Sequence, residues 1–292
     1  MPDIMENSAE LKKQNQLLEV WKSLKKNRLA VFGLCLTILL ILVAIFADVI
    51  APYDPYSNDL ANTFCYPCRA HLFGTDNMGR DQFSRVVYGA RISLLVGIST
   101  SLFGMIGGII LGSIAGYYGS HTETVIMRAM DIFMAIPGTL LAMSIMAVLG
   151  QGVGNTILAL GIGAVPRFTR VVRSAVLGVK GNAYIEAAQA IGASSFRIIT
   201  KYIVVNSLAP IIVQTTMNVA SAILAATSLS FIGLGVQPPT AEWGSMLSAA
   251  RPYIRDYGFL VLYPGLAIMA TIFGLNLFGD GLRDALDPRL KN

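Results

Sequence analysis

The sequence predicts an all-α integral membrane protein. Of its 292 residues, 54% are hydrophobic and 13% are charged, and the mean hydropathy is +0.61. Soluble domains carry about 25% charged residues, so this chain has too few to cover a globular surface. Its apolar residues also gather in stretches of about 20, the length that a helix needs to cross the hydrocarbon. The basic residues are not interleaved with aromatic ones on a polar surface, which gives no support to a nucleic-acid partner.

Six apolar stretches are candidates for membrane spans. They cover residues 29–50, 92–117, 132–149, a segment from about 155, 208–232 and 258–277. Pro166 and Arg167 are expected to interrupt the fourth after about a dozen residues. The polar, basic lead 1–28 runs into the first stretch without a small-residue cleavage site, which is typical of a retained anchor.

Six spans place both termini on one side, and the basic residues indicate which side. Sixteen of the 22 Lys and Arg residues lie on the side of the termini, and six lie on the other. The positive-inside rule makes the richer side cytosolic. We therefore expect a cytoplasmic segment 1–28, an anchor helix 29–50, an extracytoplasmic loop 51–91, a transmembrane domain 92–281 and a cytoplasmic tail 282–292. Within that domain, the loop 178–206 faces the cytosol.

Small and polar residues recur with helical spacing in two stretches. In the second, small residues predict a packing seam, within the subunit or against a sister subunit, because they let helices in lipid approach closely. They are Gly104, Gly108, Gly112 and Gly116. In the fifth, polar residues on one face indicate either a translocation pathway or hydrogen bonds between helices. They are Gln214, Asn218, Ser221 and Ser228.

Charged residues lie next to the third and fourth stretches. Arg167, Arg170 and Arg173 spread over about a third of a helix circumference. Charges are costly at the centre of a bilayer, so this half of the helix emerges into the cytosol, lines a wet cavity or ends near lipid headgroups. We expect Asp131, which together with Pro137 starts the third stretch, to be a cap or an ion-pair member and not a proton relay.

The extracytoplasmic loop contains Cys65, Cys68 and His71. This spacing has three possible interpretations: a disulfide, an incomplete metal site or free thiols. We expect no bound metal. The chain has no phosphate-binding loop and none of the common hydrolase motifs, and it has only two histidines. It is therefore expected to be a non-catalytic subunit.

The cytosolic loop predicts two short helices. Residues 182–191 favour a helix, and Gly192 can supply the positive φ that ends it. Ser194 or Ser195 can cap a second helix, expected to carry Phe196, Ile199 and Ile203 on one side. We interpret the pair as a compact knob in which Glu186 meets a partner or the chain's own basic residues. The alternative is a solvated surface hairpin.

Several motifs resemble those of bacterial ABC importers. Glu186-Ala187-Ala188 followed by Gly192 resembles the cytoplasmic-loop signature of their permease subunits, although Tyr202-Ile203-Val204-Val205 lacks its terminal Pro. Three further segments resemble the peptide and nickel subfamily and its C-type permease. They are His71-Leu72-Phe73-Gly74-Thr75-Asp76-Asn77-Met78-Gly79-Arg80-Asp81, Phe231-Ile232-Gly233-Leu234-Gly235-Val236-Gln237-Pro238-Pro239 and Gly279-Asp280-Gly281-Leu282-Arg283-Asp284-Ala285-Leu286-Asp287-Pro288.

The resemblance implies a type I importer permease with six helices and both termini in the cytosol of a bacterium, in its inner membrane. Its partners would be a second, B-type permease, two ATPase subunits that use ATP and Mg²⁺, and an extracytoplasmic binding protein. This chain would bind no cofactor. Glu186, Ala187, Ala188 and Gly192 would contact an ATPase.

The implied substrate is a di- or oligopeptide, with nickel, a metallophore or glutathione as alternatives. Two other classes are an ion-coupled transporter and a membrane scaffold. The first needs buried acidic or histidine relays, of which the apolar stretches offer almost none. The second does not need the polar face of residues 208–232.

Overall fold

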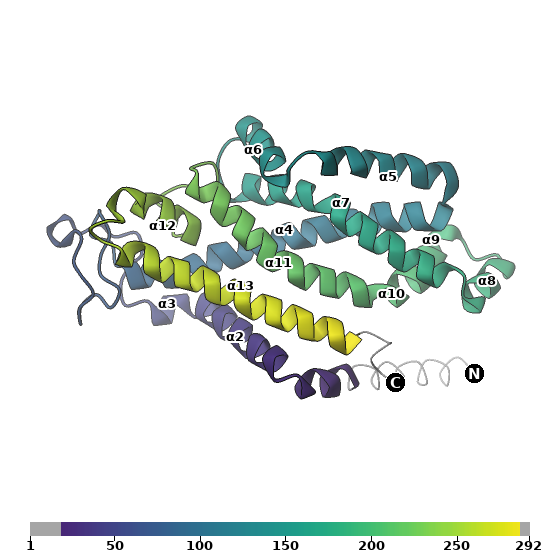
Figure 1. The fold of residues 1–292 in the computed structure, drawn as a ribbon, viewed down its shortest axis with the longest axis horizontal. Coiled ribbons are helices and arrows are strands. Elements are labelled where there is room, and N and C mark those ends of the chain that lie inside the picture. The colour runs from purple at the N-terminus through teal and green to yellow at the C-terminus, as the bar shows by residue number, and fades with distance from the viewer. Residues whose placement is uncertain (1–18, 287–292) are drawn as a thin grey trace.

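The computed structural model describes residues 19–286, and within that range the regular structure is helical, as predicted. The elements are α2 (Arg28–Ile45), α3 (Ala47–Ile50), η1 (Leu60–Asn62), α4 (Gln82–Tyr118), α5 (Ser120–Ala135), α6 (Gly138–Leu149), α7 (Val153–Lys180), α8 (Ala183–Ala190), α9 (Ser195–Arg197), the π-helix η2 (Ile198–Ile203), α10 (Val204–Asn206), α11 (Leu208–Phe231), α12 (Trp243–Ala250), η3 (Arg251–Tyr253) and α13 (Phe259–Leu286). The long helices run along the long axis, with α12 near one end and α8 at the other (Figure 1).

Four helices of the described chain, α2, α4, α11 and α13, are long and apolar enough to cross a membrane, and the bent pair α5–α6 could form a fifth span. The predicted count of six is not confirmed. The predicted segments 1–28 and 282–292, together with their basic residues, lie partly outside the described residues.

The third span predicted at 132–149 is wrong as a continuous helix. α5 ends at Ala135, α6 starts at Gly138, and the two helices meet at 88°. Pro137 causes the break, because proline has no N–H and pushes the preceding residue out of the helical region. Ile136 is accordingly extended, with φ −88° and ψ 127°.

The fourth stretch is interrupted as an apolar span, as expected, because α7 is not among the described helices that are apolar enough to cross a membrane. The helix itself nevertheless continues through Pro166 and the three arginines to Lys180. Proline is tolerated inside a membrane helix when neighbouring helices compensate for the lost backbone bond. Pro166 is buried in the structure, so the residue that signalled an end lies inside a packed helix.

Two helix boundaries differ from the apolar stretches. α4 begins at Gln82, ten residues before the predicted 92, because Asp81 caps it by accepting a hydrogen bond from the Ser84 amide at 2.7 Å. The last ten residues of the segment predicted as the loop 51–91 are therefore helical. In the first stretch, the chain turns at Phe46 between α2 and α3.

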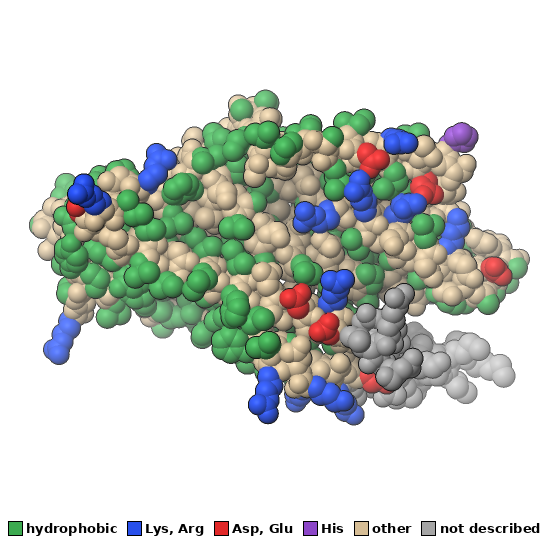
Figure 2. Space-filling model, in the orientation of Figure 1, with side chains coloured by type: hydrophobic (Ala, Val, Ile, Leu, Met, Phe, Trp, Pro, Cys, Tyr) green, Lys and Arg blue, Asp and Glu red, His purple; other side chains and the backbone are tan. Residues whose placement is uncertain are grey.

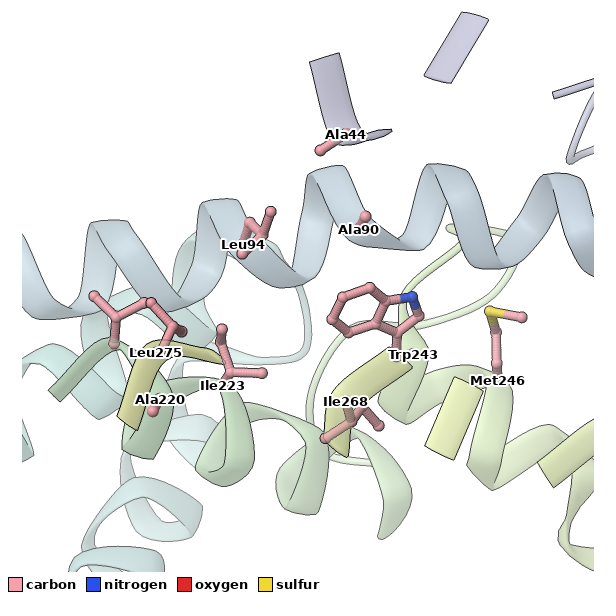
Figure 3. Packing of buried hydrophobic residues seen from close by; sticks show 10 residues of the cluster. Ala44, Ala90, Leu94, Ala220, Ile223, Trp243, Met246, Ile268 and Leu275 are labelled. Atoms are coloured by element: carbon pink, nitrogen blue, oxygen red, sulfur yellow. The ribbon is translucent and has the colours of Figure 1, made fainter. Parts of the chain in front are cut away.

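The core near α12 is organised around one tryptophan. The buried Trp243 side chain packs among residues of α4, α11 and α13, including Ala90, Ile223 and Ile268 (Figure 3). Its indole Nε1 donates to the Val86 carbonyl oxygen at 2.9 Å. Trp243 therefore ties three of the membrane-spanning helices together at this end of the molecule.

The four glycines of α4 lie against α7, within the subunit. A Cβ at Gly104 would come within 2.8 Å of the Ala164 Cβ, and one at Gly108 within 2.3 Å of the Phe168 Cβ. At Gly112 and Gly116 the obstacles are Val172 and Val176, each with an atom at 2.7 Å. Side chains at these positions would therefore push the two backbones apart.

We predict that Gly108→Ala destabilises the protein by about 1–3 kcal/mol, the usual cost of overpacking. The added methyl group must displace Phe168 or the α7 backbone. The measurement is the midpoint of thermal unfolding of the purified protein in detergent. Gly154→Ala is the matched control, because a Cβ there meets no atom within 4 Å. Equal midpoints for the two variants would contradict the seam.

Candidate coupling surface and translocation pathway

The segment 183–206, which we call the cytoplasmic knob after the side of the membrane predicted for it, is packed against the long helices. Ile185 and Ala188 of α8 are buried in one apolar cluster with Val172 and Val176 of α7 and with Ile211 of α11. Residues three apart share one face of a helix. This anchorage distinguishes the knob from the solvated hairpin that was the alternative.

The turn of the knob lies at Gly192, where φ is +77°. The Gly192 amide donates to the Gln189 carbonyl oxygen, and the Ala193 amide donates to that of Ala188, both at 3.0 Å. Backbone bonds of this kind satisfy the last carbonyl groups of a helix. Ser194 then caps α9 by accepting from the Arg197 amide at 3.4 Å.

The expectation that Phe196, Ile199 and Ile203 share one side is wrong. Phe196 is exposed, whereas Ile203 is buried. The reason is the π-helix η2, in which residues five apart lie on the same face. Ile198 and Ile203 accordingly both point into the core.

The outer surface of the knob includes one acidic side chain and two strongly exposed apolar ones. Glu186 is exposed, and no basic residue within 19–286 forms an ion pair with it. Ile191 and Phe196 are 82% and 78% exposed. Exposed apolar groups of this kind are available for contact with another protein or with lipid. The sequence offered no signal that these two side chains would be exposed.

A cavity of about 430 Å³ lies between α4, the α5–α6 break, α7 and α11. Asn218 and Ser221 of the predicted polar face line it, whereas Gln214 and Ser228 are not among the lining residues. Asn218 is also buried and donates from Nδ2 to Ser101 Oγ of α4 at 3.0 Å. Asn218 therefore fits both interpretations, because it lines the cavity and also forms a hydrogen bond between two helices.

The α7 arginines differ in their partners. Arg170 binds Asp131 of α5, with 2.6 Å between Nη2 and Oδ1, and Arg173 donates from Nε to Glu123 at 2.8 Å. Asp131 is thus an ion-pair member. Arg167 lines the cavity and forms no ion pair with any described residue. Figure 2 shows a group of basic and acidic side chains over α5 and α7.

Cys65 and Cys68, in the loop before α4, carry free thiols in the structure. His71 binds Asp81, with 2.9 Å between Nδ1 and Oδ1. No group of three or more metal-ligating side chains forms among residues 19–286. The His71 amide, which donates to the Cys68 sulfur, lowers the pKa of that thiol, whereas desolvation raises the pKa of Cys65.

Comparison with known proteins gives two family matches. Residues 108–292 match the family described as binding-protein-dependent transport system inner membrane component, and residues 15–67 match the N-terminal TM domain of oligopeptide transport permease C. The first match covers more than half of the chain. The chain belongs to this permease family. The resemblance found in its motifs is thereby confirmed, and this permease is a multi-pass protein of the bacterial inner membrane.

Relatives of the permease match along most of its length. It is 47% identical to the dipeptide transport system permease protein DppC of Alkalihalophilus pseudofirmus, over 94% of this chain and 90% of that protein. Identity is 44% to the di/tripeptide transport system permease protein DppC of Pseudomonas aeruginosa, over 94% and 93%. It is 43% to the glutathione transport system permease protein GsiD of Escherichia coli, over 94% and 90%.

Solved structures show the same fold. The permease aligns with a chain of the inward-facing MetNI methionine ABC transporter at a TM-score of 0.56 and 19% identity, covering 70% of this chain and 96% of that one. A second crystal form of that transporter aligns at a TM-score of 0.57 over 70% and 97%. At this identity, the similarity supports the arrangement of helices alone.

We predict that iodoacetamide modifies Cys68 several-fold faster than Cys65 at about pH 8, because a thiol with a lowered pKa carries more of the reactive thiolate. Cys68 is also more exposed than Cys65. Mass spectrometry of peptides from the timed reaction gives both rates within one protein, so each cysteine controls for the other. Faster modification of Cys65 would contradict this assignment.

Proposed function

We propose that this chain is a permease subunit of an ATP-driven importer that carries dipeptides and short oligopeptides. The observation that carries the proposal is the 47% and 44% identity to dipeptide and di/tripeptide permeases across 94% of the chain. The match of residues 15–67 to the oligopeptide permease model supports the same substrate class.

Glutathione is a second candidate, favoured by the 43% identity to a glutathione permease. Glutathione is itself a small peptide with free carboxylates, so one pathway can suit both substrates. No observation in residues 19–286 favours nickel or a metallophore, since no cluster of metal-ligating side chains forms there.

The proposed assembly contains a second, B-type permease, two ATPase subunits and an extracytoplasmic binding protein. The family description, which refers to binding-protein-dependent transport, supports the last of these. The lack of a phosphate-binding loop supports a separate ATPase that uses ATP and Mg²⁺. In this proposal the chain is non-catalytic and binds no cofactor.

The cytoplasmic knob is proposed to receive the movement of the ATPase. Ile191 and Phe196 offer apolar contacts and Glu186 an anionic one, on a surface that residues 19–286 leave uncovered. The knob is packed on α7 and α11 through Ile185 and Ala188. Both of these helices line the cavity. Closure of the ATPase pair would therefore move two walls of the pathway together with the knob.

The competing classes have less support. An ion-coupled transporter needs an acidic side chain that can change its proton within the membrane. Near the cavity, Asp131 and Glu123 are each held by an arginine. A scaffold without transport would not need the cavity or the polar residues that line it.

We predict that vesicles containing the complete importer take up a labelled dipeptide when ATP is supplied, and that a proton uncoupler does not stop this uptake. Competition by unlabelled dipeptide, glutathione and Ni²⁺ ranks the substrate classes, and we expect the dipeptide to compete best. Uptake that stops with the uncoupler while ATP is present would favour the ion-coupled class. The best competition by Ni²⁺ would overturn the peptide substrate.

For the coupling role, we predict that Gly192→Pro abolishes uptake and that Gly192→Ala and Glu186→Ala each lower it several-fold. Proline cannot adopt φ +77°, and alanine in the left-handed region costs about 1–2 kcal/mol. Gly181→Ala is the matched control, because φ there is −84° and a Cβ meets nothing within 4 Å. Insertion into the membrane should persist in all four variants. Normal uptake by Gly192→Pro would refute the coupling role.

A further inference from the structure

Arg167 is the arginine of α7 that faces the cavity. It lies midway along α7, about 21 Å from the start of the helix at 1.5 Å per residue, and is exposed. Its neighbours Arg170 and Arg173 are neutralised by acidic side chains, whereas Arg167 has no acidic partner in the described chain. A cation that lines a cavity in a membrane protein indicates a substrate or ion pathway.

The N-terminus of α6 faces the same cavity. Pro137 is its N-cap, no side chain caps its first turn, and Gly138 and Thr139 line the cavity. The first amides of a helix carry partial positive charge and need acceptors. A Cβ at Gly138 would meet no atom within 4 Å, so a ligand can approach this backbone closely. In membrane transporters, the start of a broken helix is suited to hold an anionic group of the substrate.

Thr100 of α4 belongs to the cavity wall, together with Asn218. It is only 1% exposed, and its Oγ1 has no hydrogen-bond partner in the structure. A buried hydroxyl without a partner costs free energy, and a polar group that reached this part of the wall would satisfy it.

We propose that this cavity is a transit site for the carboxylate of the peptide. Arg167 and the start of α6 bind the carboxylate oxygens, and Thr100 donates to the same anion or to the neighbouring peptide group. The proposal rests on the proposed function as a peptide importer and specifies its chemistry. It makes the free carboxylate, present in dipeptides and in glutathione alike, the group that this permease recognises.

The two binding elements are packed on each other. Ala142 and Met146 of α6 share one apolar cluster with Ala159 of α7, and α7 is also packed on the cytoplasmic knob. Arg167 and the start of α6 therefore face the cavity as one preformed site.

The test compares Arg167→Gln and Arg167→Lys in the complete importer, with Arg128→Gln as the matched control. The Arg128 side chain is 79% exposed on α5 and lies outside the cavity lining. Uptake of a labelled dipeptide and ATP hydrolysis are measured together, with the binding protein saturated. We expect Arg167→Gln to lower the peptides moved per ATP about tenfold, the loss typical of one charge-assisted hydrogen bond. Arg167→Lys should recover at least half of that loss, and Arg128→Gln should match the wild type.

A second measurement identifies the recognised group. The dipeptide and its C-terminal amide are supplied at concentrations that saturate the binding protein, and we expect their uptake rates to converge in Arg167→Gln. An unchanged ratio of acid to amide uptake would overturn the proposal. So would equal losses of uptake and ATP hydrolysis, which would assign Arg167 to contact with the partner permease or to coupling. Failure of the wild-type importer to carry any peptide would instead refute the proposed function.

Discussion

The close approach of α4 and α7 is the constraint on which the rest of the molecule depends. In lipid there is no hydrophobic force between helices, so association relies on close packing and hydrogen bonds. Glycine at 104, 108, 112 and 116 removes the side chains that would hold the two backbones apart. α7 contains a buried proline and three arginines, and a helix of that composition would not be stable facing lipid alone. The seam is what allows it to pass through the bundle.

α7 also joins the two functional regions. Toward its C-terminal end Val172 and Val176 hold the knob, and near its middle Arg167 lines the cavity. Arg170 and Arg173 bind α5, so that helix is tied to the same unit. Packed interfaces move as bodies and do not deform continuously. A displacement of the knob is therefore transmitted along α7 over about 8–14 Å, without any need for a chain of small side-chain changes.

The parts of the fold that depend on local chemistry could be predicted from sequence. The helix at 182–191 and its turn at Gly192 follow from alanine propensity and from the conformational freedom of glycine, and both are found. The different effects of the two prolines could not be predicted, because Pro137 breaks a helix whereas Pro166 does not, and only the packing around each distinguishes them. The exposure of Phe196 depends on the π-helix η2, which leaves no pattern in the sequence. The sequence shows the charge of Arg167, but it does not show that Arg167 lacks an acidic partner among residues 19–286.

A transport pathway does not need groups that bind the substrate tightly. A site inside the membrane must be favourable enough for the substrate to enter and weak enough for it to leave. The arginines of α7 serve two different purposes. Arg170 and Arg173 form ion pairs that hold the helices together, whereas Arg167 lies in an open cavity without an acidic partner among residues 19–286. Solvent in that cavity would screen its charge and limit how tightly it binds an anion. Selectivity can then remain with the binding protein, while the permease needs only to recognise the group that all of its substrates share.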